Sequence, residues 1–370
     1  MTSENSELAM FLETTEAFIA KTADLSTVRQ PADGSPSVDR SWWAAAAELG
    51  WMYLSVAEEC GGGSVSGRGV VDLSALLTVL GRSAAPGPLI PTTAILAALT
   101  HDDSTIDAPV EDIMSGQVIA AWVSTDLRAG SDGQVRVKPG ANGHVLQGSA
   151  SGVEFGGEAD VFLVDAADDQ GAGVIALVSS DSAGVRVLEA DSLDLARPTA
   201  TVTFDGATLD ESQIVATGAP AVAIRERQML LAQLLQAAET VGVVDAVYDM
   251  TTQWAFDRYS FGRPLASYQA LKHRFADMKV WLEGSRAIVA AAAESLEDDR
   301  ADARILVSAA KSYVGDRSVQ IIQESVQLHG GVGVTMEHPL HIYLRRATVN
   351  RMTHGTPRQH RELVAHGLGL

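Results

Sequence analysis

The chain has 370 residues, with 27 Lys and Arg against 47 Asp and Glu, which gives a formal net charge of −20. Nucleic acids and anionic membrane surfaces both attract clustered cations, so this charge argues against binding to either. The length allows two or three domains, or one large composite unit with an ample core.

The cysteine count and the first residues narrow the class further. The single cysteine, Cys60, cannot form an internal disulfide, and there is no cysteine cluster for a metal. The chain begins MTSENSE, which is acidic and polar and unlike a signal peptide. No run of about 18 uncharged apolar residues occurs, so no membrane span is predicted. We therefore expect a soluble, cytoplasmic protein.

Residues 1–112 are predicted to form an N-terminal α-helical domain. Apolar residues recur near helical spacing from Ser6 onwards. An Ala-rich helix over Trp42–Leu49 is expected to stop at Gly50, and a buried helix over Val70–Leu80 is expected to stop at Gly81.

Residues 113–218 are predicted to form a middle β domain. Short β-prone runs alternate there with Gly, Asp and Asn, and their near-regular spacing favours a small antiparallel barrel or sandwich. The expected strands lie within Val118–Val123, His144–Gln147, Val161–Val164, Gly173–Val178, Val185–Leu188 and Thr199–Phe204.

Residues 219–370 are predicted to form a C-terminal four-helix bundle. The first helical pattern is longer than a typical globular helix, which points to a bundle. The expected helices cover Met229–Phe256, Phe275–Ser295, Ala301–Leu328 and Leu340–Met352. The overall class is α+β and mostly α.

Four segments carry a family resemblance. They read LGWMYLSVAEECGG from Leu49, RYSFGRPLASYQALKHRFADM from Arg258, QLHGGVG from Gln327 and MTHGTP from Met352. With the order of helices, β domain and bundle, they make residues 40 to 366 resemble the acyl-CoA dehydrogenases. That resemblance implies a FAD-dependent α,β-dehydrogenation of an acyl-CoA thioester.

The resemblance also implies a set of cofactor contacts. In the family, the second and third segments hold the adenine and pyrophosphate end of a FAD across a subunit interface. A guanidinium suits a pyrophosphate dianion, and glycines let the backbone approach a ligand closely. A helix corner or a helix C-cap would explain either segment taken singly, but their joint presence favours the ligand. Carried over to this chain, the contacts are Arg258, Ser260, Phe261, Gln269, Gln327, Gly330 and Gly331.

The middle domain departs from the family. The loop Ser124–Asp132 keeps the family's Ala-Gly-Ser-Asp ending but lacks its proline. Within Ser151–Gly157, Gly152 and Glu154 fall where the family places a Trp and a Thr against the flavin ring. A glycine cannot stack on that ring, and a carboxylate beside it opposes the negative charge of reduction. We therefore expect this chain to lack the flavin-ring half of a site.

The position of the family's catalytic base also differs. The family removes the α proton with a glutamate in a Tyr-Glu-Gly-Thr setting, and here that position holds His354. Another branch places the carboxylate on the long bundle helix, where this chain has Ala232, with Glu239 two turns later. His354 is either a base, since imidazole titrates near neutrality, or a relic in a polar turn.

No metal site is expected around His354. His360 and His366 follow it at i+6 and i+12, which is poor spacing for ligands on one helix face. No other sequence pattern suggests a metal.

Taken together, these features resemble the non-catalytic subunit of actinobacterial heterotetrameric dehydrogenases that act on steroid side-chain CoA thioesters. A homologous partner would then supply the glutamate, the flavin-ring pocket and the acyl pocket in an α2β2 assembly. An electron-transfer flavoprotein is a candidate electron acceptor. Two alternatives remain open, namely a self-sufficient homotetramer with His354 or Glu239 as an unusual base, and a flavin-free assembly scaffold.

Overall fold

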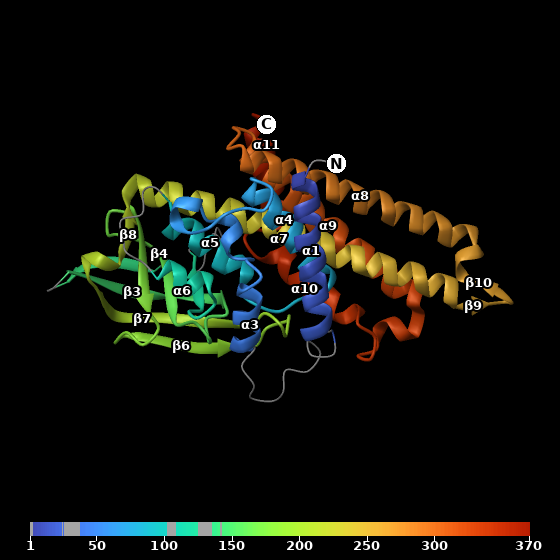
Figure 1. Ribbon diagram of the computed structural model, residues 1–370, viewed down its shortest axis with the longest axis horizontal. Helices are drawn as coiled ribbons and strands as arrows, with labels where there is room; N and C mark the ends of the chain where they lie inside the picture. Colours follow the sequence, from blue (N-terminus) through green and yellow to red (C-terminus); the bar gives the residue numbers. More distant parts are fainter. Residues whose placement is uncertain (1–2, 24, 26–37, 102–108, 125–134, 141–142) are drawn as a thin grey trace. The chain divides into compact units, whose positions relative to one another are not determined.

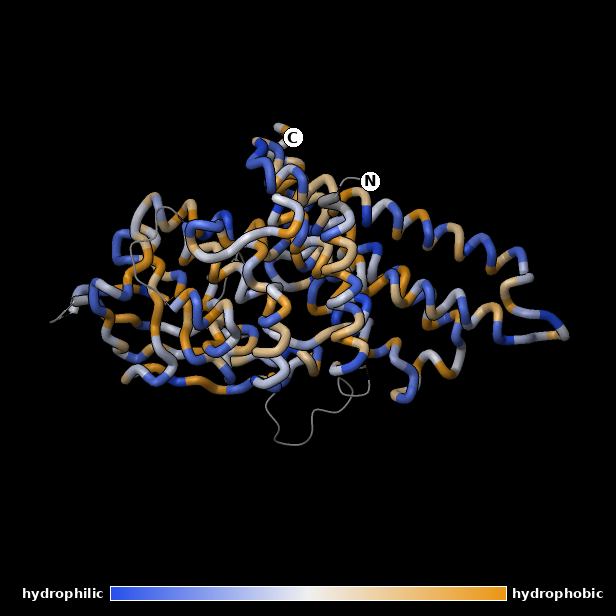
Figure 2. The backbone as a smooth tube through the Cα atoms, viewed as in Figure 1, coloured by the Kyte–Doolittle hydropathy of each residue, from blue (hydrophilic) through white to orange (hydrophobic). Residues whose placement is uncertain are grey.

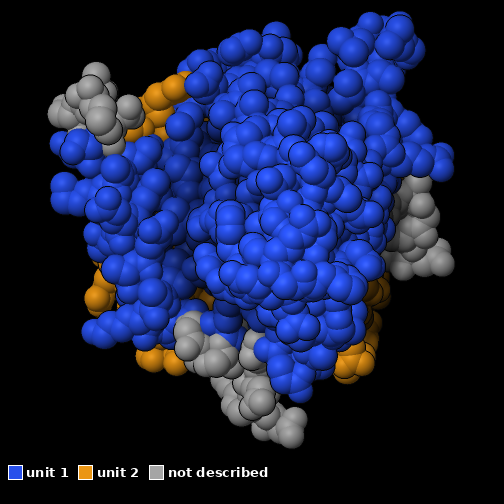
Figure 3. Space-filling model, turned by 90° about the vertical axis from the view of Figure 1, so that its right-hand side faces the viewer, with its two compact units in different colours: residues 1–30, 70–85, 233–370 blue, residues 31–69, 86–232 orange. Residues whose placement is uncertain are grey.

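The computed structural model (Figure 1) describes residues 3–23, 25, 38–101, 109–124, 135–140 and 143–370, without the side chains of residues 3–5. These residues divide between two compact units, coloured separately in Figure 3. Unit 1 comprises residues 1–30, 70–85 and 233–370, and unit 2 comprises residues 31–69 and 86–232. N-terminal helices, a sheet and C-terminal helices follow one another along the chain, which confirms the predicted fold class. The domain limits 112 and 218 stay a prediction.

An eight-stranded mixed sheet forms the centre of unit 2, in the order β6-β7-β3-β2-β4-β5-β8 with β1 paired to β4. The predicted antiparallel sheet is thus corrected, because β4 runs parallel to both β1 and β2. Its apolar face buries a core that includes Leu146, Phe162 and Phe204. The strands are β1 Ala120–Val123, β2 Arg136–Gly140, β3 Gly143–Glu154, β4 Val161–Ala167, β5 Gly173–Ser179, β6 Val185–Ala190, β7 Thr199–Leu209 and β8 Ile214–Thr217.

Short helices accompany the sheet in unit 2. Helix α3 begins after Asp39, whose carboxylate accepts hydrogen bonds from the backbone of Ser41 and Trp42. The chain leaves this helix through Gly50 at φ +87°. The α-helices of the unit are α3 Arg40–Ala47, α5 Leu89–Leu99 and α6 Val110–Met114, and the 3₁₀ turns are η1 Tyr53–Ser55, η2 Glu58–Cys60 and η3 Glu211–Gln213.

Long helices make up most of unit 1, and apolar and polar residues alternate along them (Figure 2). The predicted helix Leu340–Met352 has the observed bounds. Two of the other bundle helices extend at both ends, to Gly218–Asp257 and Gln269–Glu297, whereas the third runs over Ala303–His329 and begins two residues later than predicted. The described helices are α1 Ser3–Thr22, α4 Gly69–Arg82, α7 Gly218–Asp257, α8 Gln269–Glu297, α9 Ala303–His329, α10 Leu340–Met352 and α11 Pro357–Gly367, and the described 3₁₀ turns are η4 Leu265–Ser267 and η5 Gly330–Val334. Helix α7 belongs to this unit from Gln233 onwards.

Gly81 does not stop a helix as expected, because α4 continues to Arg82. A β-carbon on Gly81 would lie 2.0 Å from the backbone oxygen of Glu239 on α7. The contact is reciprocal, since a β-carbon on Gly242 would lie 1.9 Å from the oxygen of Thr78 on α4. The two glycines therefore allow the backbones of α4 and α7 to touch.

Helix α7 is the one described helix that is long and apolar enough to cross a membrane by length and composition. However, 89% of its most apolar 18-residue window is buried inside the protein. Its apolar residues therefore pack in the core.

Candidate functional site

A tight hairpin follows α7 and forms one wall of the candidate site. Strand β9, Tyr259–Ser260, pairs with β10, Arg263–Pro264, around a two-residue turn. Phe261 and Gly262 in that turn have φ of +50° and +80°, as a type I′ turn requires. The hydroxyl of Tyr268 donates to the carbonyl of Ser260 at 2.7 Å and fixes the base of the hairpin.

A cavity of about 530 Å³ lies between this hairpin and the end of α9, and we call it the hairpin pocket. It brings together residues from the two sequence segments that the resemblance had singled out. Five of the seven predicted cofactor contacts line it. The lining comprises Trp254, Arg258, Tyr259, Ser260, Leu265, Gln327, Leu328, His329, Gly330, Gly331 and Val332.

The other two predicted contacts lie outside the lining of the hairpin pocket. Phe261 stands at the tip of the hairpin with 97% of its surface exposed, although its backbone adopts a conformation that favours glycine. Gln269 is exposed at the first residue of α8. Neither residue lines the pocket that the other five share.

Arg258 gives the hairpin pocket an unneutralised positive charge. Its guanidinium carbon lies 6.0 Å from the centre of the Trp254 ring, and no carboxylate of the described residues pairs with it. Gly330 and Gly331 face open space, because a β-carbon on either would meet no atom within 4 Å. The pocket therefore offers an exposed cation beside a backbone that a ligand can approach closely.

His329 lines the same pocket, although no role was predicted for it from the sequence. Its Nδ1 lies 2.8 Å from the Ser325 carbonyl, which can only accept, so Nδ1 carries the proton. Burial lowers the pKa of His329 and keeps the ring neutral. Its Nε2 is then an acceptor, buried and without a hydrogen-bond partner in the described part of the chain. The sequence signal that could have indicated His329 is its position inside the QLHGG motif.

His354 lies in a turn whose backbone is held from two sides. Its φ is +55°, which is rare for a residue other than glycine. Its carbonyl accepts hydrogen bonds from Gln233 Nε2 at 3.0 Å and from His360 Nε2 at 3.1 Å. Burial, aided by the charge of Lys311, lowers the pKa of His360 to about 4, so His360 is a neutral donor at physiological pH.

Glu239 is part of a buried ion pair. Its exposed fraction is 2%, and that of Arg346 is 0%. Arg346 Nη1 lies 2.8 Å from Glu239 Oε1, and Asn350 Nδ2 lies 2.7 Å from Glu239 Oε2. Arg346 also donates to the carbonyls of Ala84 and Ala85 at the end of α4. Both carboxylate oxygens are therefore engaged in holding helices together.

A buried lysine joins this cluster. The ammonium group of Lys311, on α9, donates to Gln236 Oε1 at 2.6 Å and to the carbonyl of Asn350. Asn350 thus contacts both Lys311 and Glu239, and links α7, α9 and α10. Buried charges persist in proteins when they are paired and hydrogen-bonded in this way.

Comparison with known proteins identifies the family. The family model for the acyl-CoA dehydrogenase C-terminal domain matches residues 223–369, and the model for the N-terminal domain matches residues 5–101. Acyl-CoA dehydrogenase IpdE2 of Mycobacterium tuberculosis is 30% identical over 367 residues, covering 95% of this chain and 94% of the relative. The chain belongs to the acyl-CoA dehydrogenase family.

Solved structures of acyl-CoA dehydrogenases share the fold. The ChsE4-ChsE5 complex from Mycobacterium tuberculosis contains a chain with a TM-score of 0.85 and 25% identity, covering 100% of this chain and 98% of that one. A variant of the Tcur3481-Tcur3483 steroid dehydrogenase has a TM-score of 0.85 at 23% identity, covering 99% and 100% of the two chains. At 23% identity, this second similarity shows a shared fold and nothing more.

The structure bears on the positions at which the sequence predicts a departure of the middle domain from the family. Gly152 has φ +74° and lies at a β-bulge where the pairing of β3 with β7 shifts between Ala150 and Val153. A tryptophan would be strained in that backbone conformation, whatever space surrounds it. Glu154 ends β3 and pairs with Thr199. Of the loop Ser124–Asp132, only Ser124 is among the described residues.

The ion pair of Glu239 predicts a stability effect. Arg346→Met should lower the free energy of unfolding by about 3–5 kcal/mol, because it leaves a buried carboxylate without its cation. The measurement is urea unfolding of the purified protein. Arg358→Met is the control, because it breaks only the exposed pair with Glu362 and should cost less than about 1 kcal/mol. A loss at Arg346 no larger than in the control would contradict a structural role for Glu239.

Proposed function

We propose that this chain is the non-catalytic subunit of a heteromeric FAD-dependent acyl-CoA dehydrogenase. It contributes contacts to the adenosine and pyrophosphate end of a FAD, while a homologous partner holds the flavin ring, the acyl-CoA and the catalytic glutamate. One observation carries the proposal: the hairpin pocket gathers Arg258, Ser260, Gln327, Gly330 and Gly331, whereas the catalytic position holds His354.

The residues of the hairpin pocket fit the dinucleotide end of FAD. The unneutralised guanidinium of Arg258 suits a pyrophosphate, and the open glycines admit its close approach. The orphaned Nε2 of His329 suits a ribose hydroxyl or the adenine amino group, either of which donates. When bound, FAD supplies the acceptor for the hydride that leaves the acyl-CoA. This chain's residues bind and orient its remote end.

The proposed absence of a base in this chain rests on two positions. Glu239 is occupied by Arg346 and Asn350 and is closed to solvent, so it is poorly placed to remove a substrate proton. His354 is the remaining candidate, and its imidazole replaces the carboxylate that the family uses. We infer that the partner subunit supplies the glutamate. The self-sufficient homotetramer remains an alternative only if His354 acts as the base.

An exposed apolar end of unit 1 supports a partner. Large apolar side chains gather at the end of α7, on the hairpin and on the residues after α9, where water would otherwise cover them. They are Phe256, Tyr259, Phe261, Val332, Val334 and Met336. The ChsE4-ChsE5 and Tcur3481-Tcur3483 structures are both named for two different chains, and the second is named a steroid dehydrogenase. We accordingly propose an α2β2 assembly and a steroid side-chain CoA as the substrate class.

The stoichiometry of FAD tests the proposal directly. Expressed alone, the chain should be colourless or poorly soluble, because it lacks the flavin-ring platform. Co-expressed with its homologous partner, it should give a complex with about one FAD per two chains, measured from the flavin absorbance and the protein concentration. Two FAD per two chains would support the self-sufficient alternative, and a colourless complex would support the scaffold.

Arg258→Ala in the assembled complex should weaken FAD binding by roughly 1.5–3 kcal/mol, or about 10- to 150-fold, because it removes a charge-assisted clamp. Flavin release on dilution is the measurement. Arg258→Lys keeps the charge but loses the planar fork, so an intermediate loss is expected. The substrate affinity of the FAD-loaded fraction should change little. Unaltered FAD retention in Arg258→Ala would show that this arginine only closes a helix corner.

His354→Ala should leave turnover of the assembled complex within about a few-fold of wild type, if the partner provides the base. A true base at this position would instead cost about 10²–10⁴-fold and remove a limb of the pH–rate profile near neutrality. His354→Glu restores the family carboxylate. It should not double the flavin content or the rate per complex, because Gly152 and Glu154 still offer no platform for a second flavin ring.

A further inference from the structure

The hairpin pocket serves only one half of FAD under the proposed function. FAD joins an ADP half to a flavin mononucleotide half, and the partner subunit is proposed to hold the second. The ADP half is shared by other metabolites, among them free ADP, NAD⁺ and coenzyme A. A site distinguishes two ligands only through contacts that differ between them. The residues of this pocket therefore have no contact by which to prefer FAD over the other carriers of an ADP group.

The polar side chains of the hairpin pocket are not engaged within the chain. No side-chain hydrogen bond or ion pair joins Arg258, Ser260 or Gln327 to another described residue, and none of the lining residues is acidic. Guanidinium, hydroxyl and amide groups all donate hydrogen bonds, and phosphate oxygens accept them. The pocket can therefore take a phosphorylated ligand without breaking an internal contact.

Free ADP matches the charge of the pocket at least as well as FAD does. The pyrophosphate of FAD is esterified at both ends, whereas the outer phosphate of ADP is not and gains a further negative charge near neutrality. The attraction to Arg258 therefore does not weaken when the flavin half is removed. The pocket volume of about 530 Å³ also lies within the range of small-molecule sites.

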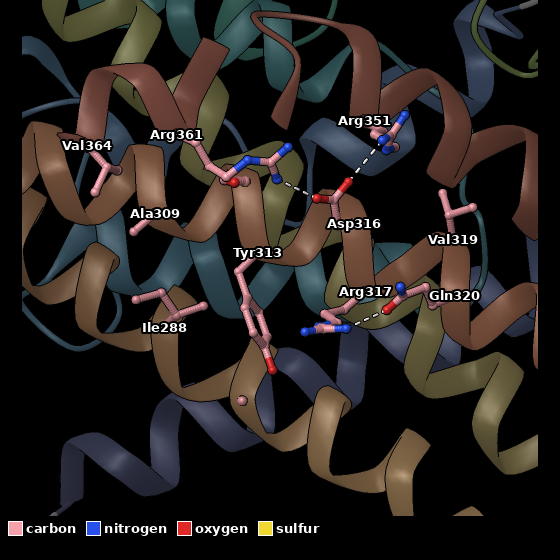
Figure 4. A pocket seen from close by; sticks show the side chains of 12 residues that line it. Ile288, Ala309, Tyr313, Asp316, Arg317, Val319, Gln320, Arg351, Arg361 and Val364 are labelled. Atoms are coloured by element: carbon pink, nitrogen blue, oxygen red, sulfur yellow. Dashed lines mark hydrogen bonds and ion pairs between the residues drawn. The ribbon is translucent and has the colours of Figure 1, made fainter. Parts of the chain in front are cut away.

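A second and larger cavity of unit 1 suits the same anion less well. It has a volume of about 1130 Å³, is lined by residues of α8, α9, α10 and α11 (Figure 4), and shares none of them with the hairpin pocket. We call it the α9 groove. Two of its three arginines, Arg351 and Arg361, donate to Asp316 at 2.9 and 2.5 Å. The third, Arg317, donates to Gln320 at 2.6 Å. An anion in this groove would meet the carboxylate of Asp316.

We propose that the hairpin pocket binds free ADP, and with it other molecules that carry an ADP group, before FAD is loaded. This inference rests on the proposed function and adds a regulation of the same site, in which adenine nucleotides compete with FAD. A competitor lowers the apparent affinity for FAD in proportion to its own occupancy of the free site. FAD prevails when the partner subunit adds contacts to the flavin half, so loading of FAD is coupled to assembly.

Isothermal titration calorimetry with ADP tests the pocket in the unassembled full-length chain and in the complex freed of FAD. The unassembled chain should bind one ADP. AMP, which lacks the pyrophosphate, should bind at least about tenfold more weakly, because it forms fewer charge-assisted hydrogen bonds. Flavin mononucleotide lacks the ADP half and should not bind at the same concentrations. Binding of flavin mononucleotide as tight as that of ADP would overturn the proposal.

Two variants locate the nucleotide. Arg258→Ala should weaken ADP binding at least about tenfold, because it removes the only cationic side chain of the lining. Gly331→Val should block the pocket without disturbing the fold, because a β-carbon at Gly331 would meet no atom within 4 Å. Circular dichroism and the thermal midpoint establish that both variants are folded.

Arg317→Ala is the matched control, because it removes an arginine of the α9 groove that has no carboxylate partner among the described residues. It should leave the ADP affinity within about twofold of wild type, since a charge outside the pocket is screened by salt. Loss of ADP binding in Arg317→Ala but not in Arg258→Ala would place the nucleotide in the α9 groove and overturn the proposal.

Competition is measured by titrating FAD into the complex freed of its cofactor and following the flavin fluorescence. With ADP present at about ten times its dissociation constant, the half-saturating FAD concentration should rise about tenfold, and excess FAD should restore full loading. An FAD titration that ADP leaves unchanged would contradict competition at one site.

Failure of this inference is distinguishable from failure of the proposed function. If the complex carries one FAD per two chains but the hairpin pocket does not bind ADP, only the competition fails. If the unassembled chain binds FAD far more tightly than ADP, it holds the flavin half itself, and the proposed non-catalytic function fails with the inference.

Discussion

The ion pair between Glu239 and Arg346 is the interaction on which unit 1 depends. It lies where α4 touches α7 backbone to backbone through Gly81 and Gly242, so there is no room for water to solvate either charge. Arg346 donates hydrogen bonds to the carbonyls of Ala84 and Ala85, which directly follow α4. The carboxylate of Glu239 accepts from Arg346 and Asn350 of α10. Removing either charge leaves the other buried and unmatched, which costs more than the intact pair contributes.

This cluster also explains the turn that carries His354. Asn350 is bonded to Glu239 and Lys311 just before the turn, and Gln233 and His360 hold the carbonyl of His354 itself. The backbone there is therefore firmly placed, in a left-handed conformation that a glycine would adopt more easily. Under the proposed function, the imidazole of His354 stands on this firmly held turn where the family has a carboxylate.

The hairpin pocket and the α9 groove differ in one physical property. Arg258 of the hairpin pocket has no carboxylate partner among the described residues, whereas two of the three arginines of the α9 groove share Asp316. In a chain with a large excess of acidic residues, an unneutralised guanidinium group in a pocket without acidic lining residues points to an anionic group from outside the chain. Phe261 is almost wholly exposed at the hairpin tip. Its apolar surface also suits a contact with a group from outside the chain.

Local sequence patterns determined much of this protein. The spacing of apolar residues predicted the four long helices after residue 219, and the motifs starting at Arg258 and Gln327 predicted residues that meet in one pocket. Helix α11 was missed, although Thr356, Pro357 and Gln359 form a capping box with proline at its start. The short strands β2 and β8 were missed because five and four residues carry little periodic signal.

Only the tertiary structure decided which polar side chains meet. Glu239 and Arg346 are 107 residues apart, and their pairing depends on how α7 and α10 cross. Gly81 looked like a helix stop because a glycine's local signal is the same at a helix end and at a close crossing. His329 gained its significance from Ser325, which fixes its tautomer, and from the pocket that its other nitrogen faces. A residue's chemistry is written in the sequence, but its partners are set by packing between segments that are distant along the chain.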